Sequence, residues 1–295
     1  MESNADFGNR YLSDRKKIFD HNAWDNVDMS EDAMKIAQVK LSQFGEASMR
    51  CERSIKDPKS CWNRFYERHG VGFFKDRDWL CREFTEIFDE CNKDLCILDV
   101  GCGVGNCALP ILNSVGHRIH KYYAFDCSTV AIEQLKRRAE SEELVHENKL
   151  HAFCFDLDND QFPDDFPLFD FVIIVFTLSS VKDPLRCMSK LMRLLKPDGL
   201  ILFRDYLHLD MAHLRFKPDQ CIKGDNVFIR GDGTIARFFR ISDLEDIFGK
   251  ECGLHKETLK VERRLQTNRA KKIEMYRRLV IAKYRNVCKI NAVVP

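Results

Sequence analysis

A glycine-rich turn that follows an apolar segment gives the strongest indication of the fold of this chain. Residues 97–106 read ILDVGCGVGN, with glycines at the alternate positions Gly101, Gly103 and Gly105, after Asp99. Glycine lets the backbone turn sharply, and it lets a ligand lie against the backbone where a Cβ atom would collide. The spacing differs from the G-x-G-x-x-G of dinucleotide-binding proteins, because the third glycine comes one residue early. The segment predicts a strand, a tight turn and a helix that bind a nucleotide-like ligand.

Two later apolar segments each end in an acidic residue. The segment 120–126 closes at Asp126, and the segment 150–157 closes at Asp156 and Leu157. A carboxylate at the end of a second strand can accept hydrogen bonds from both ribose hydroxyls of an adenosine. Asp156 could accept from the adenine amino group while Leu157 covers the ring. Each aspartate alone could equally be a helix cap or a turn residue, but three acids in register favour an adenosine site.

The remaining pattern predicts a doubly wound α/β sheet. The segment 169–181 is too continuously apolar for an edge strand, so it predicts a strand buried in a parallel sheet. A helix is predicted over 184–195 and a fifth strand over 200–206. Two final strands, 258–265 and 278–284, can pair antiparallel. Acids at the ends of the first three strands fit a sheet that binds an adenosine at its carboxyl edge.

Composition excludes several classes of protein. The chain has no run of about eighteen apolar residues and no basic, apolar leader, so neither a membrane span nor secretion is expected. Its 13 cysteines are scattered and include no C-x-x-C pair, which argues against a disulfide framework and against a zinc ribbon. We therefore expect a protein of the reducing cytosol or nucleus that binds no metal.

Charge is distributed unevenly along the chain. Residues 1–210 carry 28 Lys and Arg against 36 Asp and Glu, whereas residues 211–295 carry 19 against 10. In the basic part, cations alternate with aromatic residues, as in 215–217, 228–230 and 237–240. Such a mixture is typical of single-stranded RNA recognition, where cations bind phosphates and rings stack on bases. The alternative is an ordinary solvated helix face with no polyanion partner.

The chain divides into an N-terminal arm and a larger domain. Residues 1–60 are polar and contain a predicted helix over 31–44, and residues 61–295 hold the α/β pattern. Within the larger domain, residues 208–240 form an insertion. There the sequence RGDGT, residues 230–234, predicts a hairpin turn between two aromatic strands.

These features together resemble a known family. The D-x-G-x-G-x-G turn is the form found in class I S-adenosylmethionine methyltransferases, and nine collinear segments are similar to the eukaryotic tRNA 3-methylcytidine methyltransferases. The N-terminal segments resemble the cytosolic branch for threonine and arginine tRNAs and its mitochondrial relative, not the shorter branch that works with seryl-tRNA synthetase. One departure is Leu207, which stands where the family usually has a glycine. The matching segments are FGNRYLSD (7–14), FDHNAWDNV (19–27), CWNRFYERH (61–69), GFFKDRDWL (72–80), LDVGCGVGN (98–106), LFRDY (202–206), AHLRFK (212–217), NVFIRGDGT (226–234) and NRAKKIEMYRRLVIAKY (268–284).

The resemblance implies a fold, an activity and a partner. The expected fold is a class I methyltransferase sheet, doubly wound and mostly parallel, with seven strands of which the last is antiparallel, plus an N-terminal helical arm and an inserted β-hairpin. The expected activity is S-adenosylmethionine-dependent methylation of N3 of the cytidine at position 32, in threonine or arginine tRNAs. The implied partner is the tRNA anticodon stem-loop, with room for an accessory protein in tRNA selection. Two alternatives stay open: a methyltransferase for a protein or a small molecule, and a non-catalytic subunit that binds the donor.

In this family, a tryptophan and a tyrosine four residues apart on a helix close over the methyl donor. Here they are Trp62 and Tyr66, whose spacing puts both rings on one face of a helix. Aromatic faces attract a sulfonium cation by roughly 0.5–2 kcal/mol. From the residues alone, a hydrophobic stripe that packs on the core is the alternative. The predicted donor-binding residues are Trp62, Tyr66, Gly101, Gly103, Asp126, Asp156, Leu157 and Val175.

Methylation of cytosine at N3 requires little acid–base chemistry from the protein. Ring nitrogen 3 of cytosine carries a free lone pair, so no base has to remove a proton. The product is cationic, so negative charge or acceptors are expected where positive charge develops. Asp205, at the end of the fifth strand, is the predicted catalytic residue, with Asp76 as the second acid; the alternative for Asp205 is a loop cap. Tyr206 or Phe203 could stack on the cytosine. The other predicted substrate-binding residues are Phe74, Lys75, Arg77, Arg204, Arg215, Phe216, Arg230, Arg237, Arg240, Lys271 and Lys272.

Overall fold

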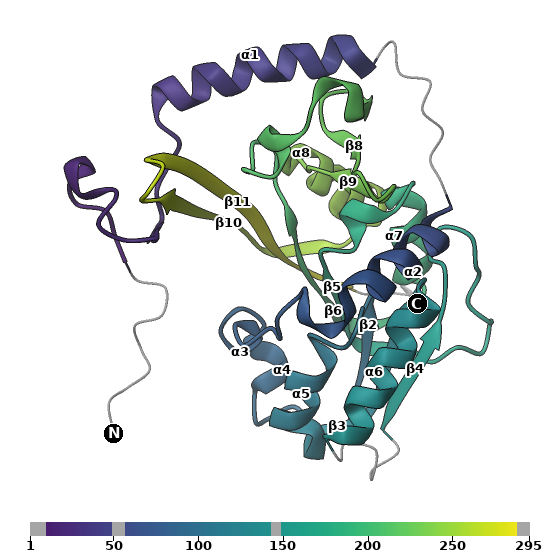
Figure 1. Ribbon diagram of the computed structural model, residues 1–295. Coiled ribbons are helices and arrows are strands. Elements are labelled where there is room, and N and C mark those ends of the chain that lie inside the picture. The colour runs from purple at the N-terminus through teal and green to yellow at the C-terminus, as the bar shows by residue number, and fades with distance from the viewer. Residues whose placement is uncertain (1–9, 49–56, 143–148, 288–295) are drawn as a thin grey trace, which may run out of the picture.

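The computed structural model describes residues 10–48, 57–142 and 149–287, and an eight-stranded sheet forms its centre (Figure 1). In spatial order the strands are β1 (Ala23–Asp25), β10 (His255–Asn268), β11 (Ile273–Arg285), β6 (Leu195–Tyr206), β5 (Phe169–Val175), β2 (Leu95–Val100), β3 (Ile119–Asp126) and β4 (Leu150–Cys154). The strands from β6 to β4 run parallel, and β11 lies antiparallel between β10 and β6. The predicted doubly wound, mostly parallel sheet with an antiparallel strand is therefore confirmed.

Alternate residues of the central strands enter two separate cores. In β5, Val172 and Ile174 belong to one core, and Phe171 and Ile173 belong to the other. Side chains of a strand point alternately to the two faces of the sheet. A strand that is covered on both faces has to be apolar throughout, which explains the unbroken run over 169–181.

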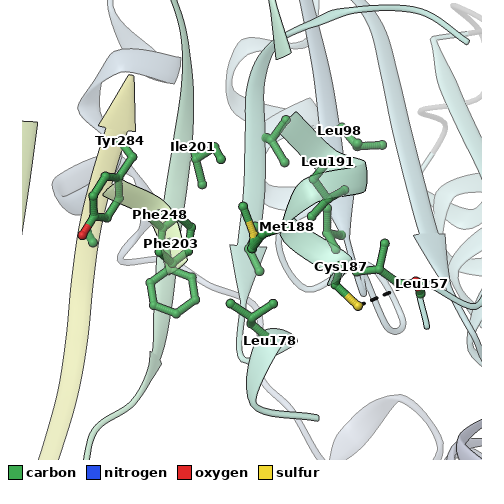
Figure 2. Packing of buried hydrophobic residues seen from close by; sticks show 14 of the residues in the cluster. Leu98, Leu157, Leu178, Cys187, Met188, Leu191, Ile201, Phe203, Phe248 and Tyr284 are labelled. Atoms are coloured by element: carbon green, nitrogen blue, oxygen red, sulfur yellow. Dashed lines mark hydrogen bonds between the residues drawn. The ribbon is translucent and has the colours of Figure 1, made fainter. Parts of the chain in front are cut away.

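Helices cover both faces of the sheet, and among those described none has the length and hydropathy needed to span a bilayer. On one face α7 and the residues after α8 pack on the strands, and Figure 2 shows this core. Phe203 is fully buried there, with its ring centre 5.1 Å from that of Phe248. The prediction that Phe203 stacks on a substrate base is therefore wrong. The helix bounds are α2 (Pro58–His69), α3 (Leu80–Glu83), α4 (Thr85–Phe88), α5 (Ala108–Val115), α6 (Thr129–Ser141), α7 (Pro184–Met192) and α8 (Ile241–Leu244).

The insertion over 208–240 forms a second, smaller sheet. Its strands are β7 (Cys221–Lys223), β8 (Val227–Ile229) and β9 (Ile235–Arg237). The predicted hairpin is confirmed as β8 and β9, and β7 adds a third strand. Helix α1 (Glu31–Ser48) lies over this sheet (Figure 1) and packs on it through Phe44, whose ring centre is 4.9 Å from that of Phe228.

The N-terminal segment also reaches the main sheet. Strand β1 pairs antiparallel with β10, so an eighth strand joins the seven that were expected. Trp24 of β1 is buried, and its indole N–H donates to the carbonyl oxygen of Ile18 at 2.7 Å. Leu265 of β10 pairs with Trp24 and belongs to the same apolar cluster. Residues far apart in the sequence thus anchor this segment.

Several predicted boundaries differ from the structure; the strand predicted over 169–181, for example, ends at Val175. The helix predicted over 184–195 ends at Met192. Strand β4 ends at Cys154, so Asp156 lies in the loop that follows the strand. There its carboxylate accepts a hydrogen bond from the N–H of Asp158 at 3.0 Å. A side chain that bonds the backbone two residues on forms a turn, and this turn ends the edge strand early.

Replacing Phe44 by alanine should release α1 from the inserted sheet. The side chain is 0% exposed, so Phe44→Ala is expected to lower the free energy of unfolding by about 3–5 kcal/mol or to unfold α1 locally. Urea unfolding measures the first effect, and amide hydrogen exchange in α1 measures the second. Ile36→Ala on the same helix is the control, because Ile36 is 71% exposed. Equal, small effects of the two changes would show that Phe44 does not anchor the helix.

Candidate active site

A pocket lies at the carboxyl ends of β2, β3 and β5, next to the point where the strand order reverses. Doubly wound sheets bind their ligands at such a switch point. The pocket is lined by Pro58, Trp62, Tyr66, Phe74, Arg77, Asp99, Gly101, Cys102, Gly103, Asn106, Cys107, Phe125, Asp126, Cys127, Phe155, Asp156, Leu157, Asp158, Val175, Phe176, Thr177, Ser180 and Val181.

All eight residues that the sequence predicted to bind the methyl donor lie in this wall. They come from α2, from the glycine turn, from the ends of β3 and β5, and from the loop after β4. The structure thus brings five separate segments together, while donor binding itself stays a prediction. The eight residues are Trp62, Tyr66, Gly101, Gly103, Asp126, Asp156, Leu157 and Val175.

The two glycines of the turn that line the pocket have no room for a side chain. Gly101 and Gly103 have φ values of +66° and +55°, a region that other residues adopt at a cost. A Cβ atom on Gly101 would lie 2.4 Å from Cγ2 of Thr177. One on Gly103 would lie 2.6 Å from the hydroxyl oxygen of Tyr66. The bare backbone of the turn therefore faces α2 and the loop after β5.

Asp126 holds the glycine turn in place. Its carboxylate accepts one hydrogen bond from the N–H of Gly103 at 3.0 Å and another from the N–H of Ser128 at 2.9 Å. The residue is 8% exposed, and burial raises the pKa of its carboxyl group. An ionised carboxylate has about four acceptor sites, so Asp126 keeps acceptor capacity for a ligand hydroxyl.

Helix α2 covers the pocket with the face that the i, i+4 spacing predicted. The rings of Trp62 and Tyr66 lie 6.0 Å apart, tilted by 33°. Between them in the sequence, Oδ1 of Asn63 accepts a hydrogen bond from the hydroxyl of Ser128 at 2.8 Å. The helix begins after Asp57, whose side chain caps it by accepting from the N–H of Ser60. The cap and the Asn63 contact fix α2 over the start of α6.

Two charged residues of the pocket, Asp99 and Arg77, were not among the residues predicted to bind the donor. Asp99 is 2% exposed, its carboxylate accepts from the hydroxyl of Tyr122 at 3.2 Å, and burial raises its pKa to about 7. Arg77 was predicted to bind substrate, but it lines the same pocket, and its buried Nε has no hydrogen-bond partner. The place of Asp99 before the first glycine was the one available signal for its role.

Asp205 does not reach the pocket. It is 0% exposed, and its two carboxylate oxygens accept from the N–H groups of Ser179 at 2.9 Å and of Tyr206 at 2.8 Å. Burial raises the pKa of this carboxyl to about 7. The expectation that Asp205 faces the base is therefore not met, because the loop after β5 folds over it. Asp205 instead positions that loop, whose Thr177 and Ser180 line the pocket.

Asp76, the second predicted acid, is also engaged within the protein. Its carboxylate accepts from Arg138 at 3.0 and 2.9 Å and from the amide of Asn106 at 2.9 Å. It does not line the pocket, whereas its neighbours Phe74 and Arg77 do. Asp76 thus ties the FFKDR segment to the glycine turn and to α6, and its proposed role in catalysis stays a prediction.

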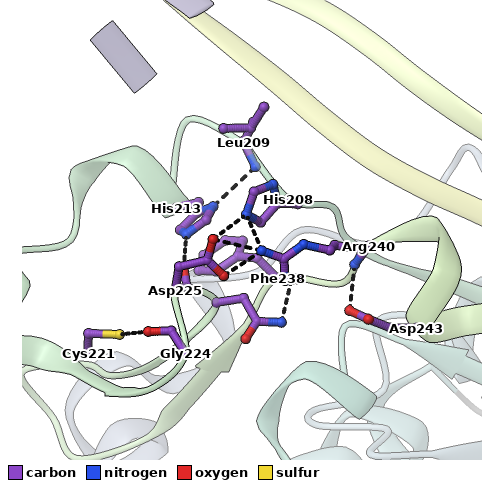
Figure 3. A network of polar contacts seen from close by, with 10 residues as sticks. His208, Leu209, His213, Cys221, Gly224, Asp225, Phe238, Arg240 and Asp243 are labelled. Carbon is purple, nitrogen blue, oxygen red and sulfur yellow. Dashed lines mark hydrogen bonds and ion pairs between the residues drawn. The ribbon is translucent and has the colours of Figure 1, made fainter. Parts of the chain in front are cut away.

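Four arginines predicted to bind substrate have partners within the protein, and substrate binding by them stays a prediction. Arg240 bonds both carboxylate oxygens of Asp225 at 2.5 and 2.7 Å (Figure 3). Arg237 donates to a backbone carbonyl at 3.0 Å, and Arg230 donates within its own hairpin turn. Arg204 is 6% exposed, with its guanidinium 4.3 Å from the ring centre of Trp79. The alternation of cations and rings in the sequence did not show which side chains have internal partners.

The other predicted substrate-binding residues lie outside the pocket or at its edge. Phe216 stacks on Phe228 in the inserted sheet at 4.5 Å, and Tyr206 lies behind the pocket wall against Phe176 at 4.8 Å. Within the described part of the chain, no three His, Cys, Asp or Glu residues form a metal site. Exposed cations remain at Lys75, Arg215, Lys271 and Lys272.

Leu207 fits its position without glycine. The side chain is 2% exposed and belongs to the main core. Its backbone N–H donates to the carbonyl of Arg278 at 3.0 Å, and it forms a bridge to Phe239 of the insertion. Leu207 is not one of the described non-glycine residues that have a positive φ. The departure from the family pattern therefore introduces no backbone strain at residue 207 itself.

Asp99→Asn should stabilise the protein in a pH-dependent way. The pKa of the Asp99 carboxyl rises from its ordinary 3.8 to about 7 on folding. Between these values the unfolded chain releases the proton that the folded chain keeps, so the wild type loses stability as pH rises towards 7. Asparagine avoids this loss and can still accept from Tyr122. Thermal unfolding at pH 4, 6 and 8 should show a gain that grows up to about pH 7 and then levels off. A pH-independent gain, or a destabilised variant, would contradict this.

The fold is similar to solved methyltransferase structures. One is an S-adenosylmethionine-dependent methyltransferase of Clostridium acetobutylicum, with a TM-score of 0.54 and 14% identity, covering 77% of this chain and 99% of that one. Another comes from Methanosarcina mazei, with a TM-score of 0.52 and 18% identity over 72% of this chain and 99% of that one. At such identities the likeness shows the fold alone.

Sequence comparison gives a more specific result. The family model for a methyltransferase domain matches residues 74–259. The tRNA N(3)-cytidine methyltransferase METTL2 of Danio rerio is 34% identical over 95% of this chain and 89% of its own, and the Drosophila melanogaster protein is 36% identical over 94% and 87%. The Saccharomyces cerevisiae tRNA(Thr) (cytosine(32)-N(3))-methyltransferase is 33% identical over 92% of this chain and 44% of its own. The chain therefore belongs to the tRNA N(3)-cytidine methyltransferase family.

Proposed function

We propose that the protein transfers a methyl group from S-adenosylmethionine to N3 of cytidine 32 in the anticodon loop of threonine or arginine tRNAs. The observation that carries this proposal is the gathering of the whole predicted donor set on one pocket wall, in a chain of this family. The relatives are named for N3-methylation of cytidine in tRNA, and the yeast relative for position 32 of a threonine tRNA. A reaction in the cytosol or nucleus and an accessory protein for tRNA selection belong to the same proposal.

The residues of the pocket fit the parts of the donor. Asp126 offers acceptors for ribose hydroxyls, and Leu157 offers an apolar surface for the adenine ring. Trp62 and Tyr66 offer aromatic faces for a sulfonium. At the amino-acid end, the Asp99 carboxyl group offers oxygen acceptors for an ammonium group. The unpartnered Nε of Arg77 supplies a donor for a carboxylate. The bare turn at Gly101 and Gly103 lets the side chains of Thr177 and Tyr66 approach the backbone, and these side chains form part of the pocket wall.

The reaction depends on correct positioning of the cytosine more than on acid–base chemistry. When bound, S-adenosylmethionine supplies a methyl group on positively charged sulfur. Cytosine N3 already carries a lone pair, so the chain has to orient the base and exclude water. Helix α2 covers the pocket, and Asp205 fixes the loop after β5 by accepting from the N–H of Ser179. No residue of the chain has to remove a proton in this scheme.

The basic part of the chain supports tRNA as the substrate. Residues 211–295 carry nine more cations than anions, as 19 against 10. After the internal arginines are set aside, the exposed cations include Lys271 and Lys272, at the turn between β10 and β11, and Arg215 near the inserted sheet. Polyanion binding through such side chains releases counterions and weakens with salt.

Nucleoside analysis tests the activity. The purified chain, incubated with S-adenosylmethionine carrying a labelled methyl group and a threonine tRNA transcript, is expected to form labelled 3-methylcytidine. A transcript with uridine at position 32 should gain no label. Gly103→Asp should abolish the reaction, because the new side chain would meet Tyr66 and place a charge in the turn. Label in another nucleoside, or in the position-32 variant, would contradict the proposed target.

Reversing two exposed lysines should weaken tRNA binding. The double change Lys271→Glu with Lys272→Glu is expected to raise the dissociation constant for tRNA and to reduce the salt slope by about 0.9 for each lost phosphate contact. Calorimetry with S-adenosylhomocysteine should show unchanged donor-site affinity. The matched control replaces Arg137 of α6 and Arg193 after α7 by glutamate. Each of these two side chains is 75% exposed. Equal effects of both pairs would mean that the turn between β10 and β11 does not contact tRNA.

A further inference from the structure

Phe176 has a backbone conformation that bulky residues rarely adopt. Its φ is +57°, and it directly follows β5. Six non-glycine residues of the described chain have a positive φ, and of these only Phe176 lines the pocket. Glycine and asparagine tolerate this region, whereas a phenylalanine there is strained. Strain of this kind gathers at functional sites, where the surrounding structure maintains it.

Contacts on both sides of Phe176 hold the strained turn. The N–H of Phe176 donates to the carbonyl of Arg204 at 2.8 Å. The hydroxyl of Thr177 donates to the carbonyl of Val100, also at 2.8 Å. The chain therefore turns sharply after β5 and brings Thr177 against Gly101. A glycine at position 176 would make the same turn without strain, so the turn does not explain the phenyl ring.

Core packing does not explain the ring either. Phe176 is half-buried at the border of the core, whereas Val175 and Leu178 on either side are buried. Its ring centre lies 4.8 Å from that of Tyr206 and 5.5 Å from the guanidinium carbon of Arg77. Tyr206 does not line the pocket, so Phe176 is the member of this aromatic pair that a bound base can reach. Tyr206 and Arg77 both contact this ring and help to fix its position.

We propose that the target cytosine stacks on the ring of Phe176 during methyl transfer, an inference that rests on the proposed function. As cytosine N3 bonds to the methyl carbon, the bond from that carbon to the donor sulfur breaks, and its electron pair stays on sulfur. The positive charge thereby moves from sulfur to the cytosine ring. An aromatic face attracts a cation, so the contact is stronger in the transition state than with the neutral base. Such differential binding accelerates the reaction.

Single-turnover methylation tests the role of the ring. With saturating donor and tRNA, Phe176→Leu is expected to slow formation of 3-methylcytidine by about 10- to 100-fold, the range for loss of a base–aromatic stack. Phe176→Tyr keeps the aromatic face and should retain the rate. Affinity for S-adenosylhomocysteine should stay unchanged in both variants. Phe73→Leu is the control, because Phe73 is 54% exposed and lies outside the pocket wall.

Phe176→Gly separates stability from catalysis. This change keeps the turn and removes both ring and strain, so the variant should melt close to the wild type and yet be as slow as Phe176→Leu. A wild-type rate in either variant would overturn the inference while the proposed function stands. A loss of donor affinity that matches the loss of rate would also overturn it, because the ring would then serve the donor. A wild-type chain that forms no 3-methylcytidine would contradict the proposed function itself.

Discussion

The arrangement of the pocket depends on one buried carboxylate. Asp126 bonds the N–H groups of Gly103 and Ser128, and so joins the end of β3 to the glycine turn after β2 and to the start of α6. Burial raises the pKa of this carboxyl, which disfavours its charge. Two backbone donors and the N-terminus of a helix offset that effect. Strand end, turn and helix therefore share a single point of attachment, and this side of the pocket is built around it.

The pocket is connected to the inserted sheet and to α1 through a chain of ring contacts. From Phe176 in the pocket wall, the contacts pass to Tyr206, then to Phe238 at 5.7 Å, to His213 at 4.6 Å and to Phe44 at 5.7 Å. Figure 3 shows the His213 region. Burial lowers the pKa of His213 to about 4, so this ring is neutral at neutral pH; it accepts from the N–H of Leu209 at 3.1 Å and donates to the carbonyl oxygen of Asp225 at 2.7 Å. The inserted sheet and α1 are thus connected to the pocket wall through successive packed rings.

The donor site was predictable from the sequence because its residues sit within a few positions of strand ends, and parallel strands bring those ends to one edge. The roles of the cations were not predictable in this way. Arg240 pairs with Asp225, 15 residues away, and Arg204 pairs with Glu262, 58 residues away, so exposure depended on tertiary partners. Phe176 gave no signal either, because a backbone dihedral that opposes local preference is visible only in the structure.

Calorimetric titration of S-adenosylhomocysteine into the wild type and Asp126→Ala tests the account most directly. Loss of hydrogen bonds to a charged group costs roughly 1.5–3 kcal/mol, so the variant should bind about 10- to 150-fold more weakly while its circular dichroism stays that of a folded protein. Asp164→Ala, which removes a fully exposed carboxylate, should bind as the wild type does. Wild-type affinity in a folded Asp126→Ala variant would contradict the account, because the adenosine would then bind elsewhere.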